Sequence, residues 1–193
     1  MPDAAHRPRL PPAMRVTPTP LAGVLLLEPR VFEDARGTLC EAWNRAKFEA
    51  LGVRAEFLQD NQSRSKKNVI RGLHYQLPPA AQAKLLRVIA GEIFDVAVDI
   101  RRSSPTFGKW YGTTLSAANR RTLWIPEGFA HGFLSLTESE VLYKIAGRYA
   151  RDCERAIRWD DPAIGIEWPL EGAPILSERD RGASPLAAAE VFP

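Results

Sequence analysis

The stretch from Asn61 to Gln76, NQSRSKKNVIRGLHYQ, holds the residues best suited to chemistry. It contains His74, one of three histidines in the chain, and histidine is the side chain whose ordinary pKa lies closest to neutral pH. Arg71 precedes it and Gln76 follows it, while Asn61 and Ser63 lie upstream, so the stretch can supply a small polar pocket. Taken alone, His74 could be a general base, a metal ligand or a buried structural residue.

A second motif bears on the choice between a metal site and a metal-free pocket. Residues 125–133, IPEGFAHGF, contain Pro-x-Gly-x-x-His ending at His131, which resembles the second signature of the cupin superfamily. Metal-binding cupins carry His-x-His and a nearby Glu in their first signature, whereas this chain reads His-Tyr-Gln from His74, followed by Lys84. A divalent cation prefers three or four imidazole, thiolate or carboxylate ligands, and an ammonium group repels it. We therefore expect no metal, and a pocket that stabilises an anion formed from substrate.

Bulk composition excludes several classes of function. The 193 residues suffice for one domain of ordinary hydrophobic and charged content. A net charge of +3 and one short basic cluster at residues 64–71 lack the sustained basic stripe of a nucleic-acid-binding protein. No apolar run approaches the ~20 residues of a membrane span, and we find no signal-peptide core. Cys40 and Cys153 lie far apart, so we expect free thiols and a cytoplasmic protein.

Short alternating strands must position these groups. Clusters of Gly, Pro, Ser and Asn separate runs in which apolar and polar residues alternate. In residues 93–100, for example, Asp95 and Asp99 share one parity and the large apolar residues share the other. Strands are predicted at residues 21–28, 38–43, 57–65, 69–76, 84–90, 92–100, 110–115, 122–125, 129–136 and 140–145. So many short strands with little helix predict a sandwich or jelly roll.

The two ends of the chain are predicted to lie outside the folded domain. Residues 1–20 contain six prolines and little periodicity, which is typical of a flexible extension. A single domain is expected at residues 21–183, with residues 184–193 as a C-terminal tail. Within the domain, one short helix is predicted at residues 45–51, with Asn44 as its N-cap.

The motifs together resemble one family within the cupins. The matching stretches are VFEDARGTLCEAWN, FLQDNQSRSKKNVIRGLHYQ, KLLRVIAGEIFDVAVDIRRSSPTFGKW, LWIPEGFAHGFLSL, VLYK, IRWDDPAIGIEWP and LSERD. They span most of residues 31–169 and extend to 180, and the combination of RGLHYQ with PEGFAHGF is specific. The chain thus resembles the dTDP-4-dehydrorhamnose 3,5-epimerase family. The resemblance implies an all-β, cupin-type jelly roll (a double-stranded β-helix) with a few short helices.

The resemblance also implies an activity and the residues that perform it. The family inverts C3 and C5 of a dTDP-4-keto-6-deoxy-hexose without a cofactor, most commonly for L-rhamnose in cell-surface polysaccharide biosynthesis. Both carbons are α to a carbonyl, so the reaction needs a base, an enolate stabiliser and an acid on the opposite face. His74 matches the family's base, and Asp180 matches the carboxylate that orients it. Lys84 matches the residue beside the developing C4 oxyanion, and Tyr143 matches the acid.

Further residues match positions that bind the dTDP-sugar in the family. The predicted substrate-binding residues are Phe32, Arg36, Glu41, Gln59, Asn61, Arg71, His131 and Tyr149. The segment that carries the first three crosses a dimer interface in the family, so the resemblance implies a homodimer. Arginine is the natural partner of diphosphate oxygens, which suits both Arg36 and Arg71.

Other functions remain open on the sequence alone. The family often has two consecutive tyrosines after VLYK, whereas this chain has Arg148 and then Tyr149. An enzyme that inverts only C3 or only C5 of a related sugar nucleotide is therefore an alternative. A metal-dependent cupin and a non-catalytic sugar-nucleotide-binding cupin are two more, although the latter would not need the four catalytic residues together.

Overall fold

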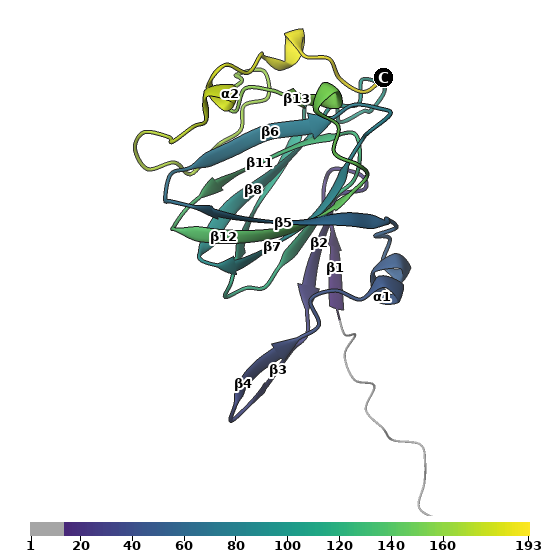
Figure 1. Cartoon of the computed structure of the whole chain (residues 1–193), viewed down its shortest axis with the longest axis vertical. Coiled ribbons are helices and arrows are strands. Elements are labelled where there is room, and N and C mark those ends of the chain that lie inside the picture. Colours follow the sequence, from purple (N-terminus) through teal and green to yellow (C-terminus); the bar gives the residue numbers. More distant parts are fainter. Residues whose placement is uncertain (1–13) are drawn as a thin grey trace, which may run out of the picture.

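Two antiparallel β-sheets packed face to face form the body of the protein (Figure 1). The computed structural model describes residues 14–193. One sheet has six strands in the order β1-β2-β10-β7-β12-β5, and the other has five in the order β13-β6-β11-β8-β9. Neighbours in each sheet are mostly distant in sequence, as in a jelly roll, where the chain crosses repeatedly between sheets. This arrangement confirms the predicted fold class.

The strands agree closely with the alternation in the sequence. The six-stranded sheet contains β1 (Met14–Pro18), β2 (Leu25–Pro29), β10 (Thr122–Ile125), β7 (Ala83–Ala90), β12 (Ser139–Ala146) and β5 (Phe57–Ser65). The five-stranded sheet contains β13 (Glu154–Ala156), β6 (Ile70–Gln76), β11 (Phe129–Ser135), β8 (Glu92–Asp99) and β9 (Trp110–Ser116). A separate hairpin of β3 (Val31–Asp34) and β4 (Gly37–Cys40) projects away from the body (Figure 1). From β5 to β12, every predicted strand end lies within one residue of the observed end.

The few helical segments are short. They are α1 (Arg45–Ala50), α2 (Glu178–Arg181) and the 3₁₀ turns η1 (Arg151–Cys153) and η2 (Leu186–Ala188). The prediction of α1 and of its cap is confirmed, because Lys47 donates its backbone N–H to the Asn44 side chain at 3.1 Å. Phe48 of α1 is fully buried against the outer face of the six-stranded sheet. No helix among residues 14–193 is long and apolar enough to cross a bilayer.

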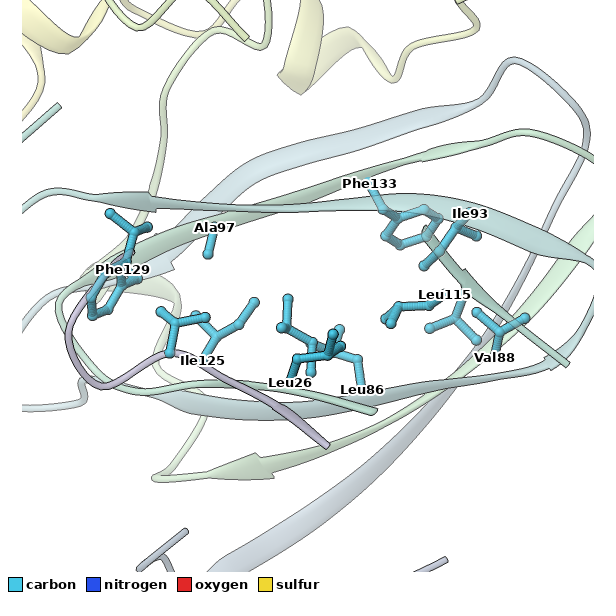
Figure 2. Packing of buried hydrophobic residues seen from close by; sticks show 13 residues of the cluster. Leu26, Leu86, Val88, Ile93, Ala97, Leu115, Ile125, Phe129 and Phe133 are labelled. Carbon is cyan, nitrogen blue, oxygen red and sulfur yellow. The ribbon is translucent and has the colours of Figure 1, made fainter. Parts of the chain in front are cut away.

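The main hydrophobic core lies between the two sheets (Figure 2). Leu26 and Leu86 point inward from the six-stranded sheet and meet Ile93, Ala97 and Phe133 from the five-stranded sheet. Burial of each large apolar side chain contributes about 1.5–3 kcal/mol. Successive side chains of a strand alternate between its faces. Ile93 and Ala97 point inward, so Asp95, which lies between them with the same parity, also points into the interior.

The C-terminal segment covers the outer face of the five-stranded sheet (Figure 1). Val96 of β8 and Leu186 belong to one buried cluster on that face. The Tyr75 hydroxyl donates to the backbone oxygen of Glu190 at 2.5 Å. The prediction that residues 184–193 form a tail outside the domain is therefore wrong, since they pack on the second, apolar face of the sheet.

The predicted N-terminal extension is wrong from Met14 onward. Strand β1 pairs with β2, with Met14 opposite Pro29, and Met14 is buried. The prediction rested on the six prolines of residues 1–20, one of which, Pro18, ends β1; proline is tolerated at strand ends and on an edge strand such as β1. Residues 1–13 lie outside the described residues. The strand predicted at 21–28 starts later, at Leu25, because a turn precedes it.

Candidate active site

A cavity of about 570 Å³ opens between the two sheets beside α2. Strands β6 and β11 supply its lining from one sheet, and β7 and β12 supply it from the other. Six of the predicted site residues line this cavity: His74, Asp180, Lys84, Tyr143, Arg71 and His131. They come from four strands and one helical turn, so only the folded chain brings them together.

His74 and Asp180 form a hydrogen-bonded pair at the cavity wall. The His74 Nε2 atom lies 2.5 Å from Asp180 Oδ1, although the residues are 106 positions apart. Burial opposes ionisation of Asp180, but the hydrogen bonds that surround its carboxylate, above all the one from His74, outweigh burial and hold the pKa of Asp180 below its ordinary value. An ionised carboxylate only accepts hydrogen bonds. We therefore assign the proton to Nε2, which leaves Nδ1 of His74 free to accept one.

The short helix α2 positions Asp180 next to His74. Ser177 caps α2 by accepting a hydrogen bond from the Asp180 backbone N–H at 3.1 Å, and Asp180 itself is only 3% exposed. Sequence reasoning did not single out Ser177, although a serine three residues before an acidic residue is a known cap signal. The cap fixes the direction of the carboxylate before any substrate binds.

Gly72 allows the two histidine-bearing strands to approach each other. Its φ of +132° suits glycine, and a Cβ there would lie 2.5 Å from the Cα of Gly132 on β11. The Gly72 N–H also points to Asp180 Oδ2 at 3.5 Å. Next to this close approach, His74 on β6 lies directly opposite His131 on β11.

His131 forms a second histidine–carboxylate pair, which the sequence did not reveal. Its Nε2 atom lies 2.7 Å from Oδ1 of Asp95 on β8, and both side chains are buried. Burial lowers the pKa of His131 against the opposing charge of Asp95, so the ring is neutral near pH 7. The sequence showed Asp95 only as a polar position in the alternation of β8, and nothing there pointed to a histidine partner or to burial.

Lys84 extends from β7 into the same cavity. Its ammonium group donates to the backbone oxygen of His74 at 3.3 Å. Burial lowers the pKa of Lys84 to about 8, although the charge of Asp95 opposes this shift. Lys84 is therefore still mainly cationic at pH 7, and its charge is poorly hydrated. Such a charge stabilises a nearby anion more strongly than a solvated one.

Tyr143 approaches the cavity from the sheet opposite His74. It lies on β12, packs partly buried against the main core, and its ring lines the cavity. Within residues 14–193 its hydroxyl makes no hydrogen bond. A histidine on one wall and a phenol on the other can act on the two faces of a bound sugar ring.

The remaining predicted substrate-binding residues do not line this cavity in the single chain. Phe32 is 49% exposed on the projecting hairpin, where Asp34 binds the Arg36 guanidinium through both oxygens. Glu41 pairs with Lys47 at 2.9 Å. Glu41 also lines a separate cavity of about 260 Å³ on the outer face of the six-stranded sheet. Their contact with a nucleotide stays a prediction.

The other three candidates, Gln59, Asn61 and Tyr149, also lie outside the cavity lining and make contacts of their own. Gln59 on β5 donates to the Asn61 side chain at 2.8 Å. Tyr149 is 59% exposed, and its hydroxyl donates to Glu154 at 3.2 Å. Their role in substrate binding also stays a prediction.

Gln76 does not contribute to the polar pocket, contrary to expectation. Its amide nitrogen donates to the backbone oxygens of Ala80 and Arg148, and its oxygen accepts from the Ala150 N–H. Gln76 therefore ties two loops together beneath β6. Over residues 14–193, no group of three or more His, Cys, Asp or Glu side chains is placed to hold a metal ion.

Comparison with known proteins identifies close relatives. Residues 18–188 match the sequence model of the family described as dTDP-4-dehydrorhamnose 3,5-epimerase. The dTDP-4-dehydrorhamnose 3,5-epimerase of Shigella flexneri is 54% identical over 181 residues, which cover 93% of this chain and 99% of the relative. A dTDP-4-dehydrorhamnose 3-epimerase of Streptomyces niveus is less similar, at 38% identity over 91% of this chain and 86% of the relative.

The solved structures include a relative with its sugar nucleotide bound. The dTDP-6-deoxy-D-glucose-3,5-epimerase of Legionella pneumophila, in complex with dTDP-4-keto-L-rhamnose, superposes with a TM-score of 0.88. It is 44% identical, and the match covers 92% of this chain and 95% of that one.

Proposed function

Because the chain belongs to the dTDP-4-dehydrorhamnose 3,5-epimerase family, we propose that it inverts both C3 and C5 of dTDP-4-dehydro-6-deoxy-glucose. The product is dTDP-4-dehydro-L-rhamnose, and no cofactor takes part. The observation that carries this proposal is the His74–Asp180 pair, which faces Tyr143 across a cavity that also holds Lys84. The greater similarity to a 3,5-epimerase than to a 3-epimerase also supports inversion at both carbons.

The first step is removal of a proton from a carbon next to the C4 carbonyl. Nδ1 of His74 accepts the proton, the C–H bond breaks, and its electron pair moves to give a C4 enolate. His74 becomes an imidazolium, which the ionised Asp180 stabilises through Nε2–H. Asp180 also keeps the ring in the required tautomer, so the pair acts as one unit.

Lys84 stabilises the negative charge that develops on the C4 oxygen. Its ammonium group is already fixed by the backbone oxygen of His74, close to the base. A charge placed before the reaction needs little reorganisation when the enolate forms, and this is often the largest catalytic contribution. The same ammonium serves both inversions, because C3 and C5 flank a single carbonyl.

Reprotonation from the other face completes each inversion. The Tyr143 hydroxyl lies on the wall opposite His74, and it donates a proton to the enolate carbon while the C4 carbonyl re-forms. Solvent then returns a proton to the phenolate and takes one from the imidazolium. The cycle repeats at the second carbon.

The proposed substrate carries a diphosphate that needs cationic partners. Arg71 lines the cavity, where Ser65 accepts from its Nε at 3.0 Å. This contact leaves part of the guanidinium for phosphate oxygens. Both cysteines are free thiols, which supports the proposal of a reducing, cytoplasmic compartment.

Isotope exchange in deuterated water tests the proposed reaction. With dTDP-4-dehydro-6-deoxy-glucose, we expect deuterium at both C3 and C5, because each proton is taken by His74 and replaced from solvent-equilibrated groups. Proton NMR of the sugar follows both positions separately. If neither C3 nor C5 exchanges, the proposed reaction is refuted. If only one of the two carbons exchanges, the protein is a single-carbon epimerase.

We also propose that the protein is a homodimer. The hairpin exposes Phe32 and Leu39, the latter 72% accessible, and exposed apolar residues of this size mark contact surfaces. The β1 edge of the six-stranded sheet is also open among the described strands. Light scattering at micromolar concentration should give twice the chain mass of 21.5 kDa. A monomer mass would contradict the dimer without affecting the isotope experiment.

A further inference from the structure

The buried Asp95 has no part in the mechanism described so far. It lies on β8 behind the cavity lining and is fully inaccessible to solvent. Its Oδ1 atom is 2.7 Å from His131 Nε2. Its Oδ2 atom is buried and has no hydrogen-bond partner among residues 14–193.

Such a carboxylate is costly to keep inside a protein core. Transfer of a charged group from water is unfavourable unless hydrogen bonds and opposite charges compensate. One neutral imidazole does not supply that compensation. Lys84 is a further source of opposite charge, and no other carboxylate in residues 14–193 affects the Lys84 ammonium as strongly as Asp95.

We propose that Asp95 is a positioning residue of this site, which orients the His131 ring and stabilises the cationic form of Lys84. It acts on the substrate only through these two residues. The inference rests on the proposed epimerase function, because it assigns Lys84 the task of stabilising the enolate.

Asp95 fixes the tautomer of His131. An ionised carboxylate accepts the proton of Nε2–H, so Nδ1 of the neutral ring is left without a proton. His131 therefore stays a neutral hydrogen-bond acceptor beside His74, which lies opposite it on β6. A cationic ring there would oppose formation of the His74 imidazolium.

Asp95 also determines the pH range over which Lys84 is charged. Burial and the nearby Arg179 lower the pKa of Lys84, whereas Asp95 and Glu154 raise it, for a result of about 8. The other titratable side chains lining the cavity are His74, His131, Tyr143, Arg71 and Asp180. Without the charge of Asp95, the pKa of Lys84 would fall further, and a larger share of the enzyme would carry a neutral amine.

The test is the pH dependence of kcat for Asp95→Asn. Asparagine keeps the shape and an oxygen that can accept from His131, but it removes the charge. We expect the alkaline limb of the profile to move down by about one pH unit, since a nearby opposite charge shifts a pKa by one unit or more. At pH 8, kcat should fall several-fold, with little change in KM.

A matched control lies on the same strand. Asp99 is equally buried, but it binds Arg101, Ser104 and Thr106 at the far end of β8. Asp99→Asn should lower the melting temperature and leave the alkaline limb where the wild type has it. A purely structural role for Asp95 predicts the same behaviour for Asp95→Asn, and that outcome would overturn the inference.

Two further arms keep the result decisive. If Asp95→Asn does not fold, the smaller neutral variant Asp95→Ser replaces it, with the same expected shift. Asp95→Glu retains the charge and should restore the alkaline limb towards that of the wild type. An unshifted limb in a folded neutral variant overturns the role of Asp95, whereas absence of isotope exchange in the wild type overturns the proposed function itself.

Discussion

His74→Ala should lower kcat about 1,000-fold or more, and it should remove deuterium exchange at C3 and C5 together. A positioned general base contributes about 10²- to 10⁴-fold to such a reaction. His74 combines a free ring nitrogen with an ionised partner that stabilises its protonated form, whereas burial lowers the pKa of His131, the other histidine lining the cavity, and keeps that ring neutral. Loss of the ring therefore removes the proton acceptor and also the group whose protonated form Asp180 stabilises. Proton NMR in deuterated water measures both positions in one experiment.

The variant should remain folded, which makes the loss of rate interpretable. The His74 side chain is 29% exposed at the cavity wall and belongs to no core cluster. A second variant, His74→Asn, can still donate a hydrogen bond to Asp180 but cannot act as a base at neutral pH. We expect it to be equally inactive with a melting temperature close to that of the wild type. Exchange above about a tenth of the wild-type rate in either variant would show that another group is the base.

The sequence predicted the strands well because alternation in a half-buried strand is a local signal. From β5 to β12 the alternation of apolar residues, together with the Gly, Pro, Ser and Asn clusters between the runs, located each strand. The alternation could not predict the contact between His74 and Asp180, because it carries no information about residues 106 positions apart. That pairing came from a family resemblance, and the geometry of the cavity now gives it a physical basis.

The local sequence pattern did not predict the role of a residue when its contact partner lies far away in the sequence. Met14 reads as part of a proline-rich extension, yet it is buried because β2 offers an edge to pair with. Leu186 reads as part of a tail, yet it covers an apolar sheet face. Asp95 helped to predict its strand but gave no sign of its pairing, because its partner His131 lies on a neighbouring strand. In each case the deciding partner is tertiary, and the sequence around the residue does not specify it.

Lys84→Met should lower kcat about 100- to 1,000-fold, the range found when one stabilising group of an oxyanion is removed. Methionine has a similar length and no charge, so the change removes the ammonium with little change in shape. Exchange at C3 and C5 should slow by the same factor, since both enolates place their charge on the one C4 oxygen. Steady-state kinetics and isotope exchange measure these two effects. As a control, Lys67→Met removes an exposed charge paired with Glu171 and should leave kcat unchanged.

The pH profile of Lys84→Met distinguishes this role from a general effect on the cavity. In the wild type, activity that depends on the ammonium is present below the pKa of Lys84 and is lost as pH rises through about 8. The methionine variant has no such group, so its residual activity should lack this alkaline limb. If the limb persists, it belongs to a group other than Lys84. Unequal slowing at the two carbons would show instead that Lys84 contacts one side of the sugar and that the C4 oxygen is stabilised elsewhere.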